Sequence, residues 1–420
     1  MTIENKKILI ISNNPLSNIQ HNGKTLASII KGISDANIYQ IYLNNAIPDF
    51  SDKCHYYNIS EIEIIRAILN KEKCGIEVKP QKNVSTYNYN AGSKIKKSNL
   101  VRLLRELIWK SNIWKNQKFK KWIENSNVDC ILFMAGDSIF AYDICKYVKS
   151  IIDVPLTTFI TDDYIMPIKS INFISKLRRK LVYKKMKKCI KNSNLLLTIS
   201  NEMAKEYKKI FNKDSLVVRN YSDALNDGEN IKNAINENEI KIIYAGGVHF
   251  NRWKIISKVG EALNCYNNSK HKNVNLYVYS SQQLSQKMLN SFKKYNIKFC
   301  GGVNEDELYR IYQDAKILLH VESFDKKSIN STRLSFSTKI PEYMSMKKCI
   351  LAIGPDEVAS MKYLKDCAYC INNINQIEDK LEKILNQDDF RNKIALDCRK
   401  KFEKDFNEED RKKILLKMLS

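Results

Sequence analysis

The sequence has no apolar run long enough to cross a membrane and no secretory leader at its start. None of its segments approaches the roughly 18 consecutive apolar residues that a membrane-spanning helix needs. The first residues, Met1 to Asn5, lead directly into strand-like sequence, without the apolar core of a signal peptide. We therefore expect a cytoplasmic protein that is either soluble or peripheral on the inner face of the cell membrane.

Glycine and proline are also scarce, with 12 and 7 residues, whereas 44% of the residues are hydrophobic. Disordered, collagen-like and low-complexity chains have the opposite composition, so these classes are excluded. The dinucleotide-binding fingerprint G-x-G-x-x-G does not occur. The 420 residues are enough for two domains, or at most three.

Cysteine is present, but not in a metal-binding arrangement. Most of the eleven cysteines are scattered singly through apolar runs, as is typical of reduced core residues. The one C-x-x-C pair, Cys367 and Cys370, has no second pair and no histidine cluster to complete four ligands. No D-x-D metal motif occurs either. We predict no metal site and no bound cofactor.

Short apolar runs alternate with longer amphipathic segments in both halves, which is typical of strand-helix-strand units around a parallel sheet. An acidic, Asn-rich segment over residues 223–239 separates the halves and predicts an exposed linker. We predict two doubly wound α/β domains over residues 1–222 and 240–395, and a C-terminal helix over residues 396–420 that is able to pack back on the first domain. Strands are expected at residues 7–12, 128–134, 154–160, 194–199 and 215–219 in the first domain, and at 240–245, 274–280, 297–300, 315–321 and 349–354 in the second.

One segment of the second domain combines helix-start residues with a lysine and a glutamate. Ser337 or Thr338 is suited to cap a helix that runs to about residue 346, because a hydroxyl accepts hydrogen bonds from the free N–H groups. A helix start attracts anions, and Lys339 adds a full positive charge. Glu342, one turn further, is placed to accept hydrogen bonds from a vicinal diol such as a ribose. A capped surface helix with an ordinary acid explains the same residues equally well.

A second segment pairs glycines with an arginine. The predicted strand over residues 240–245 is followed by Gly246 and Gly247, which allow a backbone to approach a ligand closely. Arg252 offers a fork for bidentate phosphate binding, and Lys254 adds a nearby charge.

Carboxylates follow two other predicted strands. Glu322 comes directly after residues 315–321, and Asp162 and Asp163 come after residues 154–160. Ligands of doubly wound sheets bind beyond the carboxyl ends of the strands, so these acids are candidates for binding sugar hydroxyls. A solvated loop acid for Glu322, and a helix cap for the two aspartates, are the simpler explanations.

Gly23, with Lys24 and Thr25, ends a run that matches the last part of a phosphate-binding P-loop. The first glycine of such a loop would fall at Asn18, and the loop would begin too late after its strand. A P-loop is therefore not favoured.

The segment from Thr338 to Ala352 resembles the nucleotide-binding signature S-K-x-x-E-Y-M-A-x-G-K-P-I-x-A of glycosyltransferase family 4 and related retaining enzymes of the GT-B fold. Lys347 and Cys349 stand where the family has Gly and Pro. The family usually carries a partner glutamate eight residues before the one at position 342, where this chain has Leu334.

The resemblance implies two Rossmann-like domains facing a cleft, with residue roles that follow the family. Glu322 would replace the missing first glutamate near the transferred sugar, and Glu342 would bind the ribose. Gly23 resembles the opening-loop glycine that passes close to the donor, and Asp162 lies in an Asp-Asp-aromatic element found in some polysaccharide-assembly transferases. The donor diphosphate would be held by Gly247, Arg252, Lys254, Ser337, Thr338 and Lys339.

The implied function is a retaining glycosyltransferase that moves a sugar from a nucleoside diphosphate sugar to a glycan or lipid-linked acceptor in cell-surface polysaccharide assembly. Its catalytic residues would be Arg252, Lys339, Glu322 and Asp162, without an obligatory metal. An inverting transferase with Asp162 or Asp163 as base, a sugar-nucleotide epimerase and a non-catalytic scaffold remain open alternatives. Leu334 is the observation that favours the scaffold.

Positive charge is concentrated in the first half. Residues 1–222 contain 37 Lys and Arg against 19 Asp and Glu, whereas residues 223–420 contain 33 against 27. Residues 101–124 combine basic side chains with three tryptophans, and residues 169–191 contain ten Lys and Arg and no acid. Basic helices with aromatic residues are typical of anionic membrane surfaces, although aromatic residues of a solvated helix also serve as core. No nucleic-acid-binding module is present, so lipid is the favoured anionic partner and nucleic acid is not expected.

Overall fold

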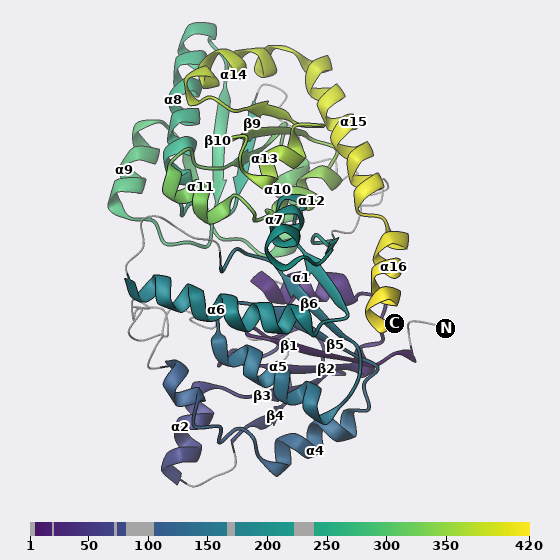
Figure 1. The fold of residues 1–420 in the computed structure, drawn as a ribbon. Helices are drawn as coiled ribbons and strands as arrows, with labels where there is room; N and C mark the ends of the chain where they lie inside the picture. The colour runs from purple at the N-terminus through teal and green to yellow at the C-terminus, as the bar shows by residue number, and fades with distance from the viewer. Residues whose placement is uncertain (1–4, 19–20, 71–73, 81–104, 166–172, 222–238) are drawn as a thin grey trace. The chain divides into compact units, whose positions relative to one another are not determined.

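The chain folds into two compact units, each with its own sheet (Figure 1). The computed structural model describes residues 5–18, 21–70, 74–80, 105–165, 173–221 and 239–420. The first unit comprises Met1–Asn220 and Glu408–Ser420, and the second comprises Tyr221–Asn407. The linker expected at residues 223–239 lies outside the described residues, except for Glu239.

Within the described residues, the first unit is built on an eight-stranded sheet in the order β4-β3-β2-β1-β5-β6-β7-β8. Its strands are parallel except for β4, which runs antiparallel to β3. The five residues of β1 are all buried, as expected for a strand covered on both faces by helices. The strands are β1 Ile8–Ser12, β2 Ile38–Tyr42, β3 His55–Asn58, β4 Ile76–Val78, β5 Cys130–Ala135, β6 Leu156–Ile160, β7 Leu195–Thr198 and β8 Leu216–Val217.

Helices connect these strands and flank the sheet (Figure 1). Those described in the first unit are α1 His21–Ile30, α2 Glu61–Asn70, α4 Gln117–Ser126, α5 Ile139–Ile151, α6 Phe173–Lys191, α7 Asn201–Phe211 and α16 Glu408–Leu419, with a short 3-10 helix over Asp35–Asn37.

The second unit has a six-stranded sheet in the order β11-β10-β9-β12-β13-β14, and every described pair in it is parallel. Its strands are β9 Ile240–Ala245, β10 Val274–Tyr279, β11 Lys298–Gly301, β12 Ile317–Val321, β13 Cys349–Ile353 and β14 Tyr369–Ile371. Its helices are α8 Arg252–Lys270, α9 Gln286–Lys294, α10 Glu305–Asp314, α11 Lys326–Thr332, α12 Lys339–Ser345, α13 Ala359–Leu364, α14 Ile377–Asn386 and α15 Asp388–Asp405, with a 3-10 helix over Ile374–Gln376. The prediction of two doubly wound α/β sheets is confirmed.

The last two helices belong to different units. Helix α15 packs on α12 and β13, so the chain as far as Asn407 stays with the second unit. Helix α16 contacts α1 and β5 of the first unit and buries Leu415 and Met418. The division between the units therefore falls after Asn407, not between residues 395 and 396 as the sequence had suggested. The reason is that α15 is one continuous helix that crosses the expected boundary.

Two of the tryptophans in the basic segment over residues 101–124 are core residues. Trp109 and Trp114 are 2% and 1% exposed, and Trp109 stacks on Phe140 with a ring-centre separation of 4.0 Å. Because these rings are buried inside the first unit, the membrane interpretation of this segment is wrong for them. Among the described residues, no helix is both long and apolar enough to span a bilayer.

Candidate functional site

The candidate site of the second unit lies where the strand order of its sheet reverses. Strands β9 and β12 are neighbours, but the chain leaves β9 toward β10 and leaves β12 toward β13. The connecting segments diverge at this point, and ligands of doubly wound sheets bind in the resulting crevice beyond the carboxyl ends of the strands. Gly246 and Gly247 follow β9, and Glu322 follows β12.

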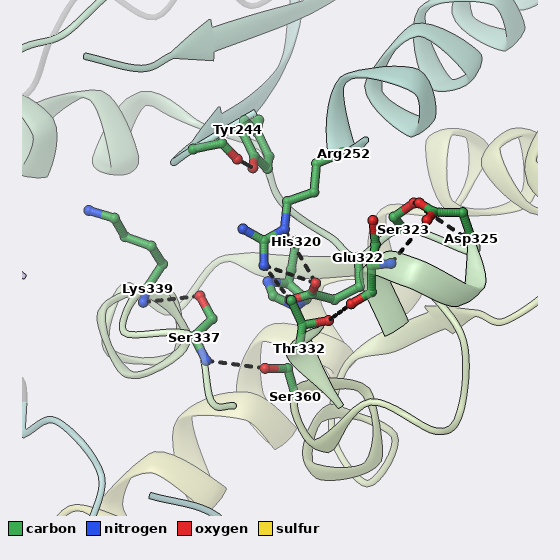
Figure 2. A network of polar contacts seen from close by, with 12 residues as sticks. Tyr244, Arg252, His320, Glu322, Ser323, Asp325, Thr332, Ser337, Lys339 and Ser360 are labelled. Carbon is green, nitrogen blue, oxygen red and sulfur yellow. Dashed lines mark hydrogen bonds and ion pairs between the residues drawn. The ribbon is translucent and has the colours of Figure 1, made fainter. Parts of the chain in front are cut away.

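An ion pair between a partly exposed arginine and a buried glutamate joins the segments that follow the two strands. Arg252, the first residue of α8, places Nη2 3.0 Å from Oε1 and 2.9 Å from Oε2 of Glu322, and Nε lies 3.3 Å from Oε2 (Figure 2). Glu322 is 2% exposed, and its N–H donates to the carbonyl of Ile353 at 2.8 Å. Burial raises the pKa of the Glu322 carboxyl, and the Arg252 guanidinium opposes that rise. The two residues that the sequence placed 70 positions apart are therefore in direct contact.

His320 completes this cluster, and the sequence prediction did not include it. It lies two residues before Glu322 on β12, so the two side chains point to the same face of the strand. Its Nε2 is 3.5 Å from Oε1 of Glu322 and has no hydrogen-bond partner among the described residues. Burial and the nearby Arg252 charge lower the pKa of His320 to about 3, so its imidazole is neutral near pH 7.

A buried neutral histidine makes stability depend on pH. The unfolded chain binds a proton at His320 below about pH 6.5 while the folded chain does not, so stability is complete above that pH and decreases as the pH falls toward 3. Compared with His320→Gln, the wild type is expected to lose up to about 1.4 kcal/mol of unfolding free energy for each pH unit below 6. Urea unfolding at pH 7, 6 and 5 measures this. The exposed His271→Gln is the control and is expected to keep the wild-type slope; an unchanged slope in His320→Gln would contradict the burial argument.

Helix α12 brings the predicted anion-binding segment to the same sheet edge. Ala245, at the end of β9, donates its N–H to the Tyr343 hydroxyl at 2.9 Å, which ties α12 to the strand that precedes Arg252. Glu342 is 6% exposed, and Lys339 Nζ lies 3.6 Å from its Oε2. The second unit therefore holds Arg252, Glu322 and α12 together at one end of its sheet.

The start of α12 differs from the expected cap. Thr338 occupies the N-cap position but makes no side-chain cap hydrogen bond. The Ser337 hydroxyl accepts a long, 3.4 Å hydrogen bond from the Lys339 N–H, and the Ser337 N–H donates to the Ser360 hydroxyl at 3.1 Å (Figure 2). The backbone at the helix start is therefore held by Ser337 and Ser360.

The loop after β9 is shaped by its own side chains. A Cβ on Gly247 would lie 2.4 Å from the His249 ring, so any larger residue there requires the His249 side chain to move. The Tyr244 hydroxyl donates to the Gly247 carbonyl at 2.7 Å and fixes the turn. Lys254 is exposed and its amine lies over the Trp253 ring, 5.9 Å from the ring centre. No contact in the described structure brings Lys254 to the Arg252–Glu322 pair.

Asp325 and Asn251 form a second link between the two strand ends that the sequence reading missed. Asp325 accepts a hydrogen bond from Asn251 Nδ2 at 3.0 Å and caps α11 by accepting from the Ser328 N–H at 3.0 Å. Burial raises the pKa of Asp325, but hydrogen bonds from Ser323, Ser328 and Asn251 hold it well below the ordinary range. The only sign of this link in the sequence was the polar segment directly after Glu322. In the structure this segment forms the Asp325 cap and helix α11.

The remaining predicted residues lie in the first unit. Asp162 follows β6, is partly exposed and accepts a 3.4 Å hydrogen bond from the Tyr164 hydroxyl. Asp163 accepts from the Ile165 N–H at 3.1 Å and pairs with Arg179 at 3.6 Å. Asp163 therefore has the structural role of a loop cap, which leaves Asp162 as the better candidate for a ligand.

Gly23 lies in the first turn of α1, where the backbone passes very close to the loop after β1. A Cβ at this position would be 2.4 Å from the Pro15 carbonyl oxygen and 2.9 Å from the Ser17 nitrogen. The close approach that requires glycine is thus between two parts of the chain itself.

Two Rossmann-like units with a polar cluster at the switch point of the second are the arrangement of the GT-B class. Residues 261–417 match a family model described as glycosyl transferase-like. A comparison with curated protein sequences finds no match.

Several solved structures share the fold over nearly the whole chain. HepE from Anabaena, solved with UDP and glucose, is 11% identical over 99% of both chains, with a TM-score of 0.61. Sucrose-phosphate synthase from Thermosynechococcus elongatus is 10% identical over 98% of this chain and 97% of its own, with a TM-score of 0.63. TarM from S. aureus is 14% identical with a TM-score of 0.54; 72% of this chain aligns, spanning only 58% of TarM. At these identities the likeness shows a shared fold.

Residues 261–417 are therefore similar to a glycosyl transferase-like family, and nearly the whole chain shares the fold of GT-B glycosyltransferases. The resemblance drawn from the segment around Glu342 is therefore confirmed for the fold, and the family match over residues 261–417 agrees with it.

Proposed function

We propose that the chain transfers a sugar from a UDP-sugar to a glycan or lipid-linked acceptor, with retention of configuration at the transferred carbon. The observation that carries this proposal is the ion pair between Arg252 and the buried Glu322 at the switch point of the second unit. UDP is supported as the nucleotide by HepE, solved with UDP and with UDP-glucose, and by an E. coli enzyme of the same fold solved with UDP-2-fluoro glucose.

The diphosphate would be neutralised by two side chains and by backbone groups. Arg252 uses Nε and Nη2 for Glu322, whereas Nη1 forms no hydrogen bond with a described residue and is available for a phosphate oxygen. Lys339 and the backbone N–H groups after Ser337 lie at the start of α12, between β12 and β13, and would add positive potential there. Negative charge develops on the departing diphosphate in the transition state, so fixed cations there stabilise it more than the bound substrate.

The two glutamates would orient the donor. Glu342 is buried beside Lys339 and would accept hydrogen bonds from the ribose diol. Glu322, held in place by Arg252, would accept from a hydroxyl of the transferred sugar. Because Arg252 and Lys339 supply the countercharge, the proposed mechanism requires no metal ion. Lys254, which lies outside this cluster, has at most a long-range electrostatic role.

The acceptor side is proposed for the first unit. Asp162 lies at the carboxyl end of β6 with its carboxylate partly exposed, where it would bind an acceptor hydroxyl. The basic character of the first unit supports an anionic or lipid-linked acceptor, as in the assembly of cell-surface polysaccharides.

A panel of UDP-sugars and GDP-sugars, followed for slow hydrolysis and nucleotide release, tests the proposal. Release of UDP from one UDP-sugar is expected. With a simple alcohol as acceptor, NMR of the glycoside formed, which does not mutarotate, should show the anomeric configuration of the donor. An inverted product would assign Asp162 the role of a base, and an epimerised nucleotide sugar would indicate an epimerase. No nucleotide release from any donor, together with no nucleotide-dependent rise in melting temperature, would favour a non-catalytic scaffold.

A further inference from the structure

Helix α6 of the first unit buries one face and leaves the other open. Arg178, Val182, Met186 and Ile190, spaced four residues apart, are all buried. They form the face that packs in the unit, where α6 contacts α5 and α7. The opposite face of this 19-residue helix is exposed over its whole length.

The exposed face carries large apolar side chains at its N-terminal end. Phe173 is 78% exposed, and Leu177 and Leu181, each one turn further, are 44% and 38% exposed. Ile174, beside them, is 38% exposed. Single exposed apolar residues are common on protein surfaces, but four on adjacent turns of one helix form a contiguous apolar strip.

Lysines surround this strip, and six of them have no described carboxylate within ion-pair distance. Helix α6 contains nine Lys and Arg and no acidic residue. Arg178, Arg179 and Lys185 pair with aspartates of the first unit. The other six are exposed and lie within 4.0 Å of no carboxylate oxygen in the described parts of the chain: Lys176, Lys180, Lys184, Lys187, Lys188 and Lys191.

We propose that the outward face of α6 docks on an anionic lipid surface. Six unpaired lysines match a layer of negative headgroups, and the strip from Phe173 to Leu181 is suited to shallow insertion at the level of the acyl-chain boundary. Lysine stems lie along apolar surface while their amines reach the headgroups, so both kinds of side chain serve the same contact. A nucleic-acid backbone would match the lysines but leave Phe173 and Leu177 in water. This docking does not depend on the proposed transfer reaction.

Vesicle flotation of the full chain tests this surface. The protein is mixed with vesicles of phosphatidylcholine alone or of phosphatidylcholine with phosphatidylglycerol, at low and at high salt. The test variant is Leu177→Ser/Lys180→Glu on α6. The control, Leu289→Ser/Lys293→Glu on α9, makes the same changes at a leucine that is 39% exposed and at an exposed lysine of the second unit. Thermal unfolding of both variants establishes that they are folded.

Wild type and control are expected to float with the anionic vesicles and to be released by salt, and the α6 variant is expected to partition at least about tenfold less. Equal flotation on neutral vesicles, or equal flotation of the α6 variant and the control, would overturn the proposal.

A second experiment measures the binding of a short RNA by fluorescence anisotropy. RNA binding tighter than vesicle binding and lost in the α6 variant would assign the face to nucleic acid. A dimer that dissociates in the same variant would assign it to a second copy of the chain.

Discussion

Replacing Arg252 with alanine is expected to abolish sugar transfer and to lower the free energy of unfolding by about 3–5 kcal/mol. The loss of stability follows because Glu322, which is 2% exposed, would lose the countercharge and hydrogen bonds that offset its burial. The loss of activity follows because the guanidinium is the best-placed cation for the leaving diphosphate. A fall in kcat of about a thousandfold is expected from removing one such group. Urea unfolding and UDP release measure the two effects.

A second variant separates folding from function at this position. In Arg252→Met/Glu322→Gln both charges are absent, so most of the lost stability should return while transfer remains abolished. Lys254→Ala is the matched control, because it removes a cation two residues away whose amine lies over Trp253. Its activity and stability should stay close to wild type. If Arg252→Met/Glu322→Gln regained activity together with stability, Arg252 would have only a structural role.

Replacing Glu342 with alanine is expected to weaken UDP binding by about 10- to 100-fold, because hydrogen bonds to a charged group contribute about 1.5–3 kcal/mol each. The carboxylate is buried in the first turn of α12, beside the Lys339 amine, so water cannot replace it easily. Calorimetric titration with UDP measures the change. The loss of affinity should be smaller for a ligand that lacks a ribose, such as inorganic pyrophosphate, because it does not contact the site proposed for the diol.

Two controls define the role of Glu342. Glu357→Ala removes an exposed carboxylate elsewhere in the second unit and should leave UDP affinity unchanged. Glu342→Gln preserves the size of the side chain and should bind UDP with intermediate affinity, because an amide accepts one of the two hydrogen bonds. Wild-type affinity in Glu342→Ala would show that the ribose is bound elsewhere.

The strands that the sequence predicted correctly are mostly apolar. Strand β9 has the predicted bounds, and the other nine predicted strands appear within a few residues of their expected ends. Strands β2, β3, β4 and β14 were missed because they are short or contain polar residues. Gln40, in the middle of β2, is fully buried and accepts the Leu16 N–H at 2.8 Å, so a side chain that suggests a surface position serves the core instead.

Site residues that lie close together in the sequence could be predicted from their spacing. Residues that are distant in the sequence and are brought together by the sheet were harder to predict. Lys339 and Glu342 lie three residues apart on one helix, so their proximity follows from helical geometry. The pairing of Arg252 with Glu322 depends on β9 and β12 being neighbours, which the sequence indicates only through the fold. His320 was missed because a histidine within an apolar strand has no pattern that distinguishes a core residue from a site residue. Leu334, at the position of the family's first glutamate, is 2% exposed and belongs to the core.

Hydrogen–deuterium exchange of the full chain with and without UDP tests the central claim most directly, because it locates the bound nucleotide in the sequence. We predict that UDP slows exchange in two segments of the second unit, from Gly246 to Arg252 and from Ser337 to Glu342, and that Arg252→Met/Glu322→Gln removes the protection. Protection confined to the first unit, or exchange that UDP does not change in either segment, would contradict the account.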